Sequence, residues 1–391
     1  MRPHRSRPPT GYRGPVRVAL LNWRDTAHPE GGGSEVYLEH MAEYLVDAGH
    51  HVTLVTAQPG GMPDEEWRQG VRVIRRGSKL GVYREARKLL RSGELGELDV
   101  VVDTQNAIPF LSPWATSAPV VVLVHHVHRE QWPVIYDPVR ARVGWWIESR
   151  LAPRVYRESA YIAVSEATAA ELVDLGVDAH RISVVRNGIT RSEAPPTLRE
   201  SQPRILVLGR LVPHKRVEHV LRAAATLRRT HPGLTVAVVG EGWWHDDLRA
   251  TARQLRVDDI VEFTGRVAEA EKVRQIDRAW VLALPSLKEG WGLVVLEAAD
   301  RGVPAVAYTE AGGVRESIAR DESGLLVDGG PLEFTTALDR ILSDAQLRGQ
   351  LGERARARSA DFAWCESGRA FEEILVRATQ SSRRPRTARR Q

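Results

Sequence analysis

The sequence predicts an α/β protein made of two doubly wound domains of similar size, with a cleft between them. The chain has 391 residues, which is long for a single hydrophobic core. Short apolar runs alternate with segments of helical periodicity, a pattern typical of parallel βαβ units. This alternation stops at a polar, proline-bearing stretch near the middle of the chain and then restarts, which indicates a linker between two domains.

Residues 15–189 are expected to form the N-terminal domain. The alternation begins with a strand at 15–23, continues with an amphipathic helix at 35–49 that ends at a glycine, and returns to a strand at 51–57. The other apolar runs that we interpret as strands of this domain are 98–104, 119–126, 159–165 and 181–189.

The linker is expected at 190–203, and residues 204–360 should form the C-terminal domain. A last segment, 361–378, is expected to be a helix that crosses back to the N-terminal domain. In doubly wound folds ligands bind at the carboxyl ends of the strands, so two such domains place a ligand in the cleft between them. The expected strands are 204–211, 234–240, 260–265, 280–286 and 303–308, and the expected helices are 217–230, 245–256, 268–279 and one after Trp291.

The positive charge of the chain is concentrated at its two ends. Residues 1–14 carry four arginines and residues 379–391 carry five, and neither segment contains an acidic residue. The formal charge of the whole chain is +5, so without these nine arginines the remainder carries about −4. We therefore expect two disordered basic tails and no specific nucleic-acid partner.

The composition is that of a soluble protein. No apolar run approaches the ~20 residues that span a bilayer, and no apolar segment follows the basic N-terminus, so we expect no signal peptide. The single cysteine, Cys365, excludes an intrachain disulfide and fits a reducing cytoplasm.

Two glutamates stand eight residues apart around an apolar run: Glu289 precedes an expected helix and Glu297 lies in its second turn. Eight helical residues rise about 12 Å, which places the carboxylates on the order of 10 Å apart. A glycosidase pair is closer, at about 5 Å or roughly 6.5–9.5 Å. Gly290 and Gly292 expose backbone N–H groups at the helix N-terminus, which favours an anion. The segment therefore predicts a site for a sugar joined to a phosphate.

The stretch E-G-W-G-L-V-V-L-E at 289–297 resembles the E-x7-E motif of the retaining glycosyltransferases of family 4, which have the GT-B fold. Three companion motifs occur in the family's order: G-G-G-S-E at 31–35, V-H-H at 124–126 and G-R-L-V-P-H-K at 209–215. The resemblance covers roughly residues 16–375. It implies two Rossmann-like domains, with the acceptor on the N-terminal side and the nucleotide-sugar donor on the C-terminal side.

The resemblance implies a role for each matching residue. Arg210 and Lys215 would hold the donor diphosphate, and Glu297 would accept hydrogen bonds from the ribose hydroxyls. Glu289 would bind hydroxyls of the transferred sugar, and His125 would lie near the reacting carbon or the 6-hydroxyl. The remaining donor-binding positions are Gly33, which lets the backbone approach the ligand, the backbone of Arg266 and Val267 beside the base, and the segment Trp291, Gly292 and Leu293.

Some interpretations stay open at this stage. Any of His125, His126 and His128 could face the site. Trp291 stands where the family usually has another residue, which leaves the sugar undetermined. The segment 129–156 mixes tryptophans with arginines, so it is either a peripheral contact with an anionic membrane or a core helix with a charged outer face.

The resemblance implies a cytoplasmic hexosyltransferase, with the inner face of the membrane as an alternative location. It would move a sugar from a UDP- or GDP-sugar to a hydroxyl of a glycan, a lipid-linked or a small-molecule acceptor, forming an α-glycosidic bond. We expect no metal, since the chain has no D-x-D pair, and no cofactor, since the nucleotide sugar is a substrate. The alternatives are a GT-B nucleotide-sugar epimerase and a non-catalytic scaffold that binds nucleotide sugar.

Overall fold

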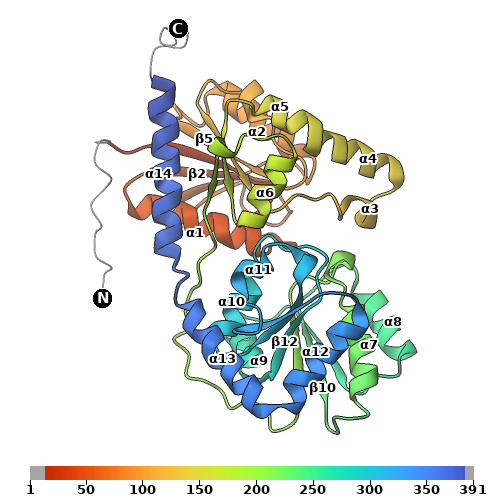
Figure 1. Ribbon diagram of the computed structural model, residues 1–391. Coiled ribbons are helices and arrows are strands. Elements are labelled where there is room, and N and C mark those ends of the chain that lie inside the picture. Colours follow the sequence, from red (N-terminus) through yellow and green to blue (C-terminus); the bar gives the residue numbers. More distant parts are fainter. Residues whose placement is uncertain (1–13, 384–391) are drawn as a thin grey trace.

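The computed structural model describes residues 14–383, which form two α/β domains, one above the other in Figure 1. The first domain contains an eight-stranded sheet in the order β3-β4-β2-β1-β5-β6-β7-β8, and the second contains a six-stranded sheet in the order β11-β10-β9-β12-β13-β14. All neighbouring strands pair in parallel except β3 and β4. The predicted fold class, two doubly wound domains, is confirmed.

The strands of the first domain are β1 (Arg17–Leu21), β2 (His51–Thr56), β3 (Glu65–Arg68), β4 (Val71–Arg75), β5 (Val100–Gln105), β6 (Val120–Val124), β7 (Ala160–Ala163) and β8 (Ile182–Val184). Its α-helices are α1 (Gly33–Asp47), α2 (Gly81–Ser92), α3 (Trp132–Ile135), α4 (Pro138–Trp146), α5 (Ala152–Val155) and α6 (Glu166–Asp174). A π-helical turn, η2 (Ile147–Leu151), joins α4 to α5, and two 3₁₀ turns are η1 (Ser112–Trp114) and η3 (Ala179–Arg181).

The strands of the second domain are β9 (Arg204–Leu208), β10 (Thr235–Val239), β11 (Val261–Gly265), β12 (Val281–Leu284), β13 (Ala305–Tyr308) and β14 (Gly324–Val327). Its α-helices are α7 (Glu218–Leu227), α8 (His245–Gln254), α9 (Glu269–Arg278), α10 (Leu293–Asp300), α11 (Val314–Ser317), α12 (Pro331–Ser343) and α13 (Ala345–Ser359). The 3₁₀ turns are η4 (Pro213–Lys215) and η5 (Thr309–Ala311).

The antiparallel pair β3–β4 was not predicted. Strand β3 has the sequence EEWR and no fully buried residue, so it lacks the apolar run from which the other strands were inferred. The turn consists of Gln69 and Gly70, both with positive φ (48° and 79°), a combination typical of two-residue hairpins.

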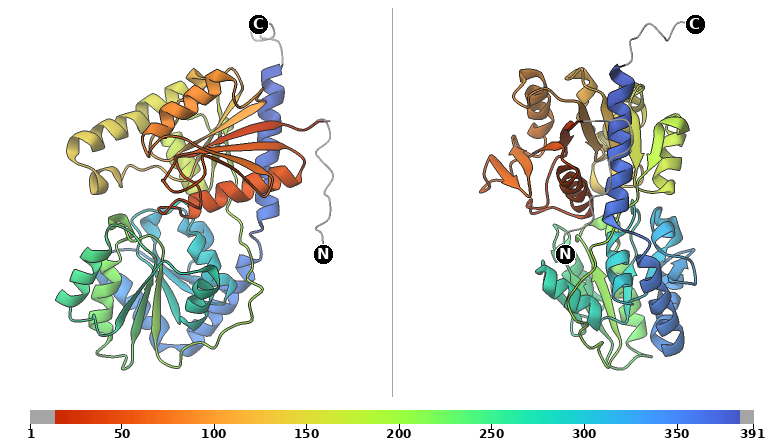
Figure 2. Two further views of the ribbon diagram at one scale, coloured as in Figure 1. Left: turned by 180° about the vertical axis from the view of Figure 1, so that it is seen from behind. Right: turned by 90° about the vertical axis from the view of Figure 1, so that its left-hand side faces the viewer.

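The last helix, α14 (Trp364–Arg383), lies along the first domain although the chain enters it from the second (Figures 1 and 2). It packs on α1, and a Cβ at Gly368 would lie 2.2 Å from the Tyr44 ring, so the glycine permits this close contact. Residues 379–383 were predicted to belong to a disordered tail, but they are helical here and Thr379 is buried. The remainder of the two predicted tails, apart from Gly14, lies outside the described residues.

The cores of the two domains meet. The buried cluster on one face of the first sheet includes Leu20 and Val102 of the sheet and Phe371 of α14, together with Trp291 and Leu296 of the second domain. Apolar packing therefore fixes the beginning of α10 against the first domain, next to the cleft.

Candidate active site

A cleft of about 610 Å³ separates the two domains. It lies where the carboxyl ends of strands from both sheets face each other, as expected for this fold. The structure brings all eleven residues of the predicted site to its walls: Gly33, His125, Arg210, Lys215, Arg266, Val267, Glu289, Trp291, Gly292, Leu293 and Glu297.

The two predicted diphosphate ligands follow β9. Arg210 has no hydrogen bond or ion pair with residues 14–383, and burial, with the nearby charge of Arg24, lowers its pKa to about 10. Lys215 ends the turn η4, and its Nζ donates to Oε1 of Glu289 at 2.5 Å. One guanidinium without a partner and one paired ammonium therefore face the same cleft.

The predicted sugar-binding segment approaches the first domain closely. A Cβ at Gly290 would lie 2.2 Å from the carbonyl oxygen of His125, so only glycine fits. Gly292 adopts φ +87° and directly precedes α10, whose first residue is Leu293. The N–H groups of the first turn of α10 therefore point toward the cleft, where they favour a negative charge.

Glu297 lies one turn further along α10 and accepts a hydrogen bond from Lys272 Nζ at 2.9 Å. Burial lowers the pKa of Lys272, but the neighbouring carboxylates of Glu297 and Glu269 outweigh this effect, so the pKa lies above its usual value. Lys272 also lines the cleft, and sequence reasoning missed it because a single lysine on α9 matches no motif.

Gly33 begins α1 and lies against the second domain. A Cβ at this position would lie 3.0 Å from Cδ1 of Leu293. The adjacent Gly32 donates its N–H to Glu35 Oε2 at 2.7 Å, so the buried Glu35 caps the helix. Burial raises the pKa of this carboxyl, but Arg24, the Ser34 hydroxyl and the charge of Arg210 together outweigh that effect, so the pKa is lowered.

All three histidines of the loop after β6 line the cleft. His125 is 6% exposed, lies edge-on to Tyr37 and has a buried Nε2 without a partner among the described residues. Burial lowers its pKa to about 4, so the ring is neutral at physiological pH. Burial also lowers the pKa of His126, whose Nε2 is likewise without a partner among the described residues.

Two predictions are refined by the side chains. The Trp291 indole is 2% exposed and lies edge-on to Phe362, so this residue can offer a donor only its backbone. In the 129–156 segment Trp132 is buried, whereas Trp146 is 55% exposed, so the segment has both a core face and an apolar outer face.

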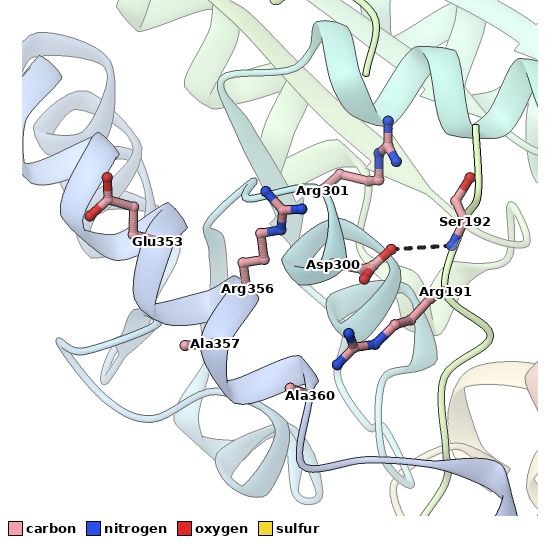
Figure 3. A pocket seen from close by; sticks show the side chains of 8 residues that line it. All are labelled: Arg191, Ser192, Asp300, Arg301, Glu353, Arg356, Ala357 and Ala360. Carbon is pink, nitrogen blue, oxygen red and sulfur yellow. Dashed lines mark hydrogen bonds between the residues drawn. The ribbon is translucent and has the colours of Figure 1, made fainter. Parts of the chain in front are cut away.

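Figure 3 shows a second hollow of about 420 Å³ between the interdomain linker, the end of α10 and α13. Two of its polar side chains have partners: Asp300 accepts from the Ser192 N–H at 3.3 Å, and Arg301 forms a bidentate ion pair with Asp277. None of the predicted site residues lines it, and its contacts attach the linker to the second domain.

Within residues 14–383 no group of three or more histidine, cysteine, aspartate or glutamate residues could hold a metal ion. No helix in this described part of the chain is long and apolar enough to span a membrane.

The fold and the cleft define a two-domain α/β protein with a candidate ligand site between its domains. The model described as "Glycosyltransferase Family 4" matches residues 31–193, and "Glycosyl transferases group 1" matches residues 189–358. The chain belongs to glycosyltransferase family 4, has the GT-B fold and is a glycosyltransferase that uses a nucleotide sugar.

Among curated relatives, the glycogen synthase of Mycobacterium tuberculosis is 27% identical, with 95% of this chain and 97% of the relative covered. The GDP-mannose-dependent alpha-(1-6)-phosphatidylinositol monomannoside mannosyltransferase of Mycolicibacterium smegmatis is 28% identical, with 89% and 95% covered.

Among solved structures, sucrose-phosphate synthase from Thermosynechococcus elongatus has a TM-score of 0.77 at 21% identity, with 94% of this chain and 98% of that chain covered. Anabaena Alr3699/HepE in complex with UDP-glucose has a TM-score of 0.71 at 18% identity, with 92% and 99% covered. These likenesses bear on the fold alone.

Proposed function

We propose that the protein is a retaining hexosyltransferase that moves a sugar from a UDP- or GDP-sugar to an acceptor hydroxyl and forms an α-glycosidic bond without a metal. The observation that supports this proposal is the convergence of Arg210, Lys215 and the N-terminus of α10 beside Glu289. Together they form an electropositive wall next to a carboxylate.

Each group has a role in the proposed reaction. Arg210, Lys215 and the α10 amides stabilise the negative charge that develops on the leaving diphosphate. Glu289 binds hydroxyls of the transferred sugar, and Glu297 binds the ribose further along the same helix. No residue is required to form a covalent intermediate, because Glu289 holds hydroxyls instead of attacking the anomeric carbon.

The relatives support either nucleotide. A GDP-mannose-dependent enzyme is among the similar sequences and a UDP-glucose complex is among the similar structures. A thermal-shift screen with UDP-, GDP-, ADP- and dTDP-sugars tests the donor, because a ligand at 100 times its Kd adds ~2.7 kcal/mol of apparent stability. No shift with any of these sugars would contradict the proposed donor site.

The proposed transfer reaction has to be distinguished from epimerisation of a nucleotide sugar and from binding without catalysis. A transferase releases free nucleoside diphosphate when an acceptor is added, an epimerase interconverts two nucleotide sugars without an acceptor, and a scaffold does neither. Chromatography of the nucleotide products with and without a glycan, a lipid-linked or an inositol-type acceptor distinguishes the three.

We also propose that α4 contacts an anionic membrane, which would deliver a lipid-linked acceptor. Val139, Val143 and Trp146 are 67%, 53% and 55% exposed and follow one face of the helix. The arginines 140, 142 and 150 on the same helical segment are exposed. Apolar side chains beside exposed arginines suit the interface of an anionic bilayer.

Flotation with vesicles tests this contact. The wild type is expected to bind vesicles that contain phosphatidylglycerol, less so at high salt, and the double variant Val143→Ser, Trp146→Ser is expected to lose binding. Equal flotation of both proteins, or no flotation of either, would contradict the membrane contact and leave the transfer reaction unaffected.

A further inference from the structure

A fully buried carboxylate is paired with a histidine that lines the cleft, and the pair lies outside every motif named above. Glu148 is in the π-helical turn η2, and its side chain is 0% exposed. Its Oε1 accepts from both the backbone N and Nδ1 of His128, each at 3.0 Å, and its Oε2 accepts from Trp132 Nε1 at 2.7 Å. The carboxylate is thus fully committed to orienting two cleft residues.

The local sequence is adapted to this arrangement. A Cβ at Gly144, on the turn of α4 before Glu148, would lie 2.2 Å from the Trp132 ring, so the indole can reach Glu148 only over a glycine. The π-helical turn then rotates Glu148 inward, and such turns are frequent at functional sites.

The contact with Glu148 fixes which ring nitrogen of His128 faces the cleft. Because Nδ1–H donates a hydrogen bond to the carboxylate, the neutral ring carries its free lone pair on Nε2. Nε2 has no hydrogen-bond partner among residues 14–383, and His128 lines the cleft. His125 and His126 have no carboxylate partner in this described part of the chain, and their Nε2 atoms are buried.

His128 lines the same cleft as the residues proposed to hold the donor. His128 is one of the charges that lower the pKa of His214, after burial, Lys215 and Arg210. His214 directly precedes Lys215, which is bonded to Glu289. The titratable groups around His128 are therefore Glu148 from η2, His125 and His126 from its own loop, and His214 from the opposite domain.

We propose that His128 is a catalytic residue that takes the proton of the acceptor hydroxyl, and that Glu148 is its positioning residue. This inference rests on the proposed transfer reaction. The acceptor O–H bond breaks and its proton moves to Nε2, while the acceptor oxygen bonds to the anomeric carbon on the face from which the diphosphate leaves. The bond from that carbon to the diphosphate oxygen breaks on the same face, so the configuration is retained, and its electron pair leaves with the nucleoside diphosphate. The imidazolium, stabilised by Glu148, then releases its proton to water.

The test compares His128→Gln, Glu148→Gln and the control His180→Gln, at an exposed position of η3 away from the cleft, across pH 5–9, with kcat/KM for transfer and donor Kd as separate measurements. General base catalysis contributes typically 10²–10⁴-fold, so His128→Gln should lower transfer at least ~10²-fold and leave donor Kd nearly unchanged. It should also abolish the acid limb of the pH profile, which His180→Gln should retain.

Glu148→Gln gives an independent readout, also if His128→Gln fails to fold. Removing the anion takes away the partner that holds the ring and stabilises its protonated form, so kcat/KM for transfer should fall while donor Kd stays nearly unchanged. A wild-type enzyme that transfers sugar, with unchanged kcat/KM in these two variants or with losses in donor binding equal to the losses in transfer, would overturn the inference. A wild type that consumes no nucleotide sugar would instead contradict the proposed function.

Discussion

Lys215 Nζ lies 2.5 Å from Glu289 Oε1, so a residue expected to hold the donor diphosphate is bonded to one expected to hold the donor sugar. The pair joins the turn after β9 to the segment before α10. The proposed donor has to share or displace this bond when it enters, which couples the two halves of the proposed donor site.

Replacing either cation of the cleft should weaken use of the donor without unfolding the protein. A charge-assisted hydrogen bond contributes ~1.5–3 kcal/mol, so Arg210→Ala and Lys215→Ala should each lower kcat/KM for the donor about 10- to 100-fold. Lys88→Ala, at an exposed position of α2 away from the cleft, is the matched control. Unchanged kcat/KM in both cleft variants would remove these residues from the donor site.

Transfer should proceed without a divalent metal. In the proposed site Arg210, Lys215 and the α10 amides neutralise the diphosphate, a role that a metal has in other enzymes. The activity after treatment with EDTA and gel filtration should match that of the untreated enzyme. Loss of activity that added Mn²⁺ restores would show that a metal takes part.

Acid should destabilise the protein through its buried histidines. Because burial lowers the pKa of His125 to about 4, the unfolded chain binds more protons than the folded chain as pH falls below the ordinary value near 6.5. The resulting loss of stability begins there and is complete near pH 4, with a magnitude on the order of 3 kcal/mol for this residue.

Urea unfolding at several pH values measures this effect. The free energy of unfolding should depend less on pH in His125→Gln than in the wild type. His51→Gln, at an exposed position of β2, should retain the wild-type dependence. A His125→Gln curve parallel to that of the wild type would show that this ring titrates normally.

The sequence was sufficient to predict the two domains, because buried parallel strands are continuous apolar runs that pattern analysis detects. The same criterion failed for β3, an edge strand with the sequence EEWR, which contains no apolar run. It also placed the end of the last helix too early, because the contacts of α14 with the first domain involve residues distant in sequence.

The residues of the candidate site also fall into those that the sequence predicts and those that it does not. The predicted residues belong to motifs with backbone geometry of their own, such as Gly292 with its positive φ before α10. Lys272 and Glu148 belong to no such motif: Lys272 reaches the cleft, and Glu148 reaches His128 behind it, only through packing of helices that the sequence leaves unplaced. The burial of the Trp291 indole likewise depends on α14 and Phe362, far along the chain.

Gly33 leaves little room for a side chain. A Cβ would lie 3.0 Å from Leu293 Cδ1, so in Gly33→Ala the end of the Leu293 side chain has to shift within the cleft, and kcat/KM for the donor should fall by up to about tenfold, ~1.4 kcal/mol. Shortening the opposing side chain should restore the fit, so the double variant Gly33→Ala, Leu293→Ala should regain most of the loss. A double variant no better than Gly33→Ala would mean that the glycine serves the ligand and not the domain contact.

Replacing Glu289, just before α10, and replacing Glu297, within it, should change different kinetic constants. Glu297 is proposed to bind the ribose equally in the ground and transition states, so Glu297→Ala should mostly raise the donor KM. Glu289 is proposed to lie beside a sugar that becomes oxocarbenium-like, so Glu289→Gln should lower kcat about 10²-fold or more, ~2.7 kcal/mol. Proton NMR of the fresh product should show an α-linkage from an α-configured donor. A β-linkage would rule out retention. It would also rule out the role proposed for Glu289, which is to bind hydroxyls of the sugar and not to attack the anomeric carbon.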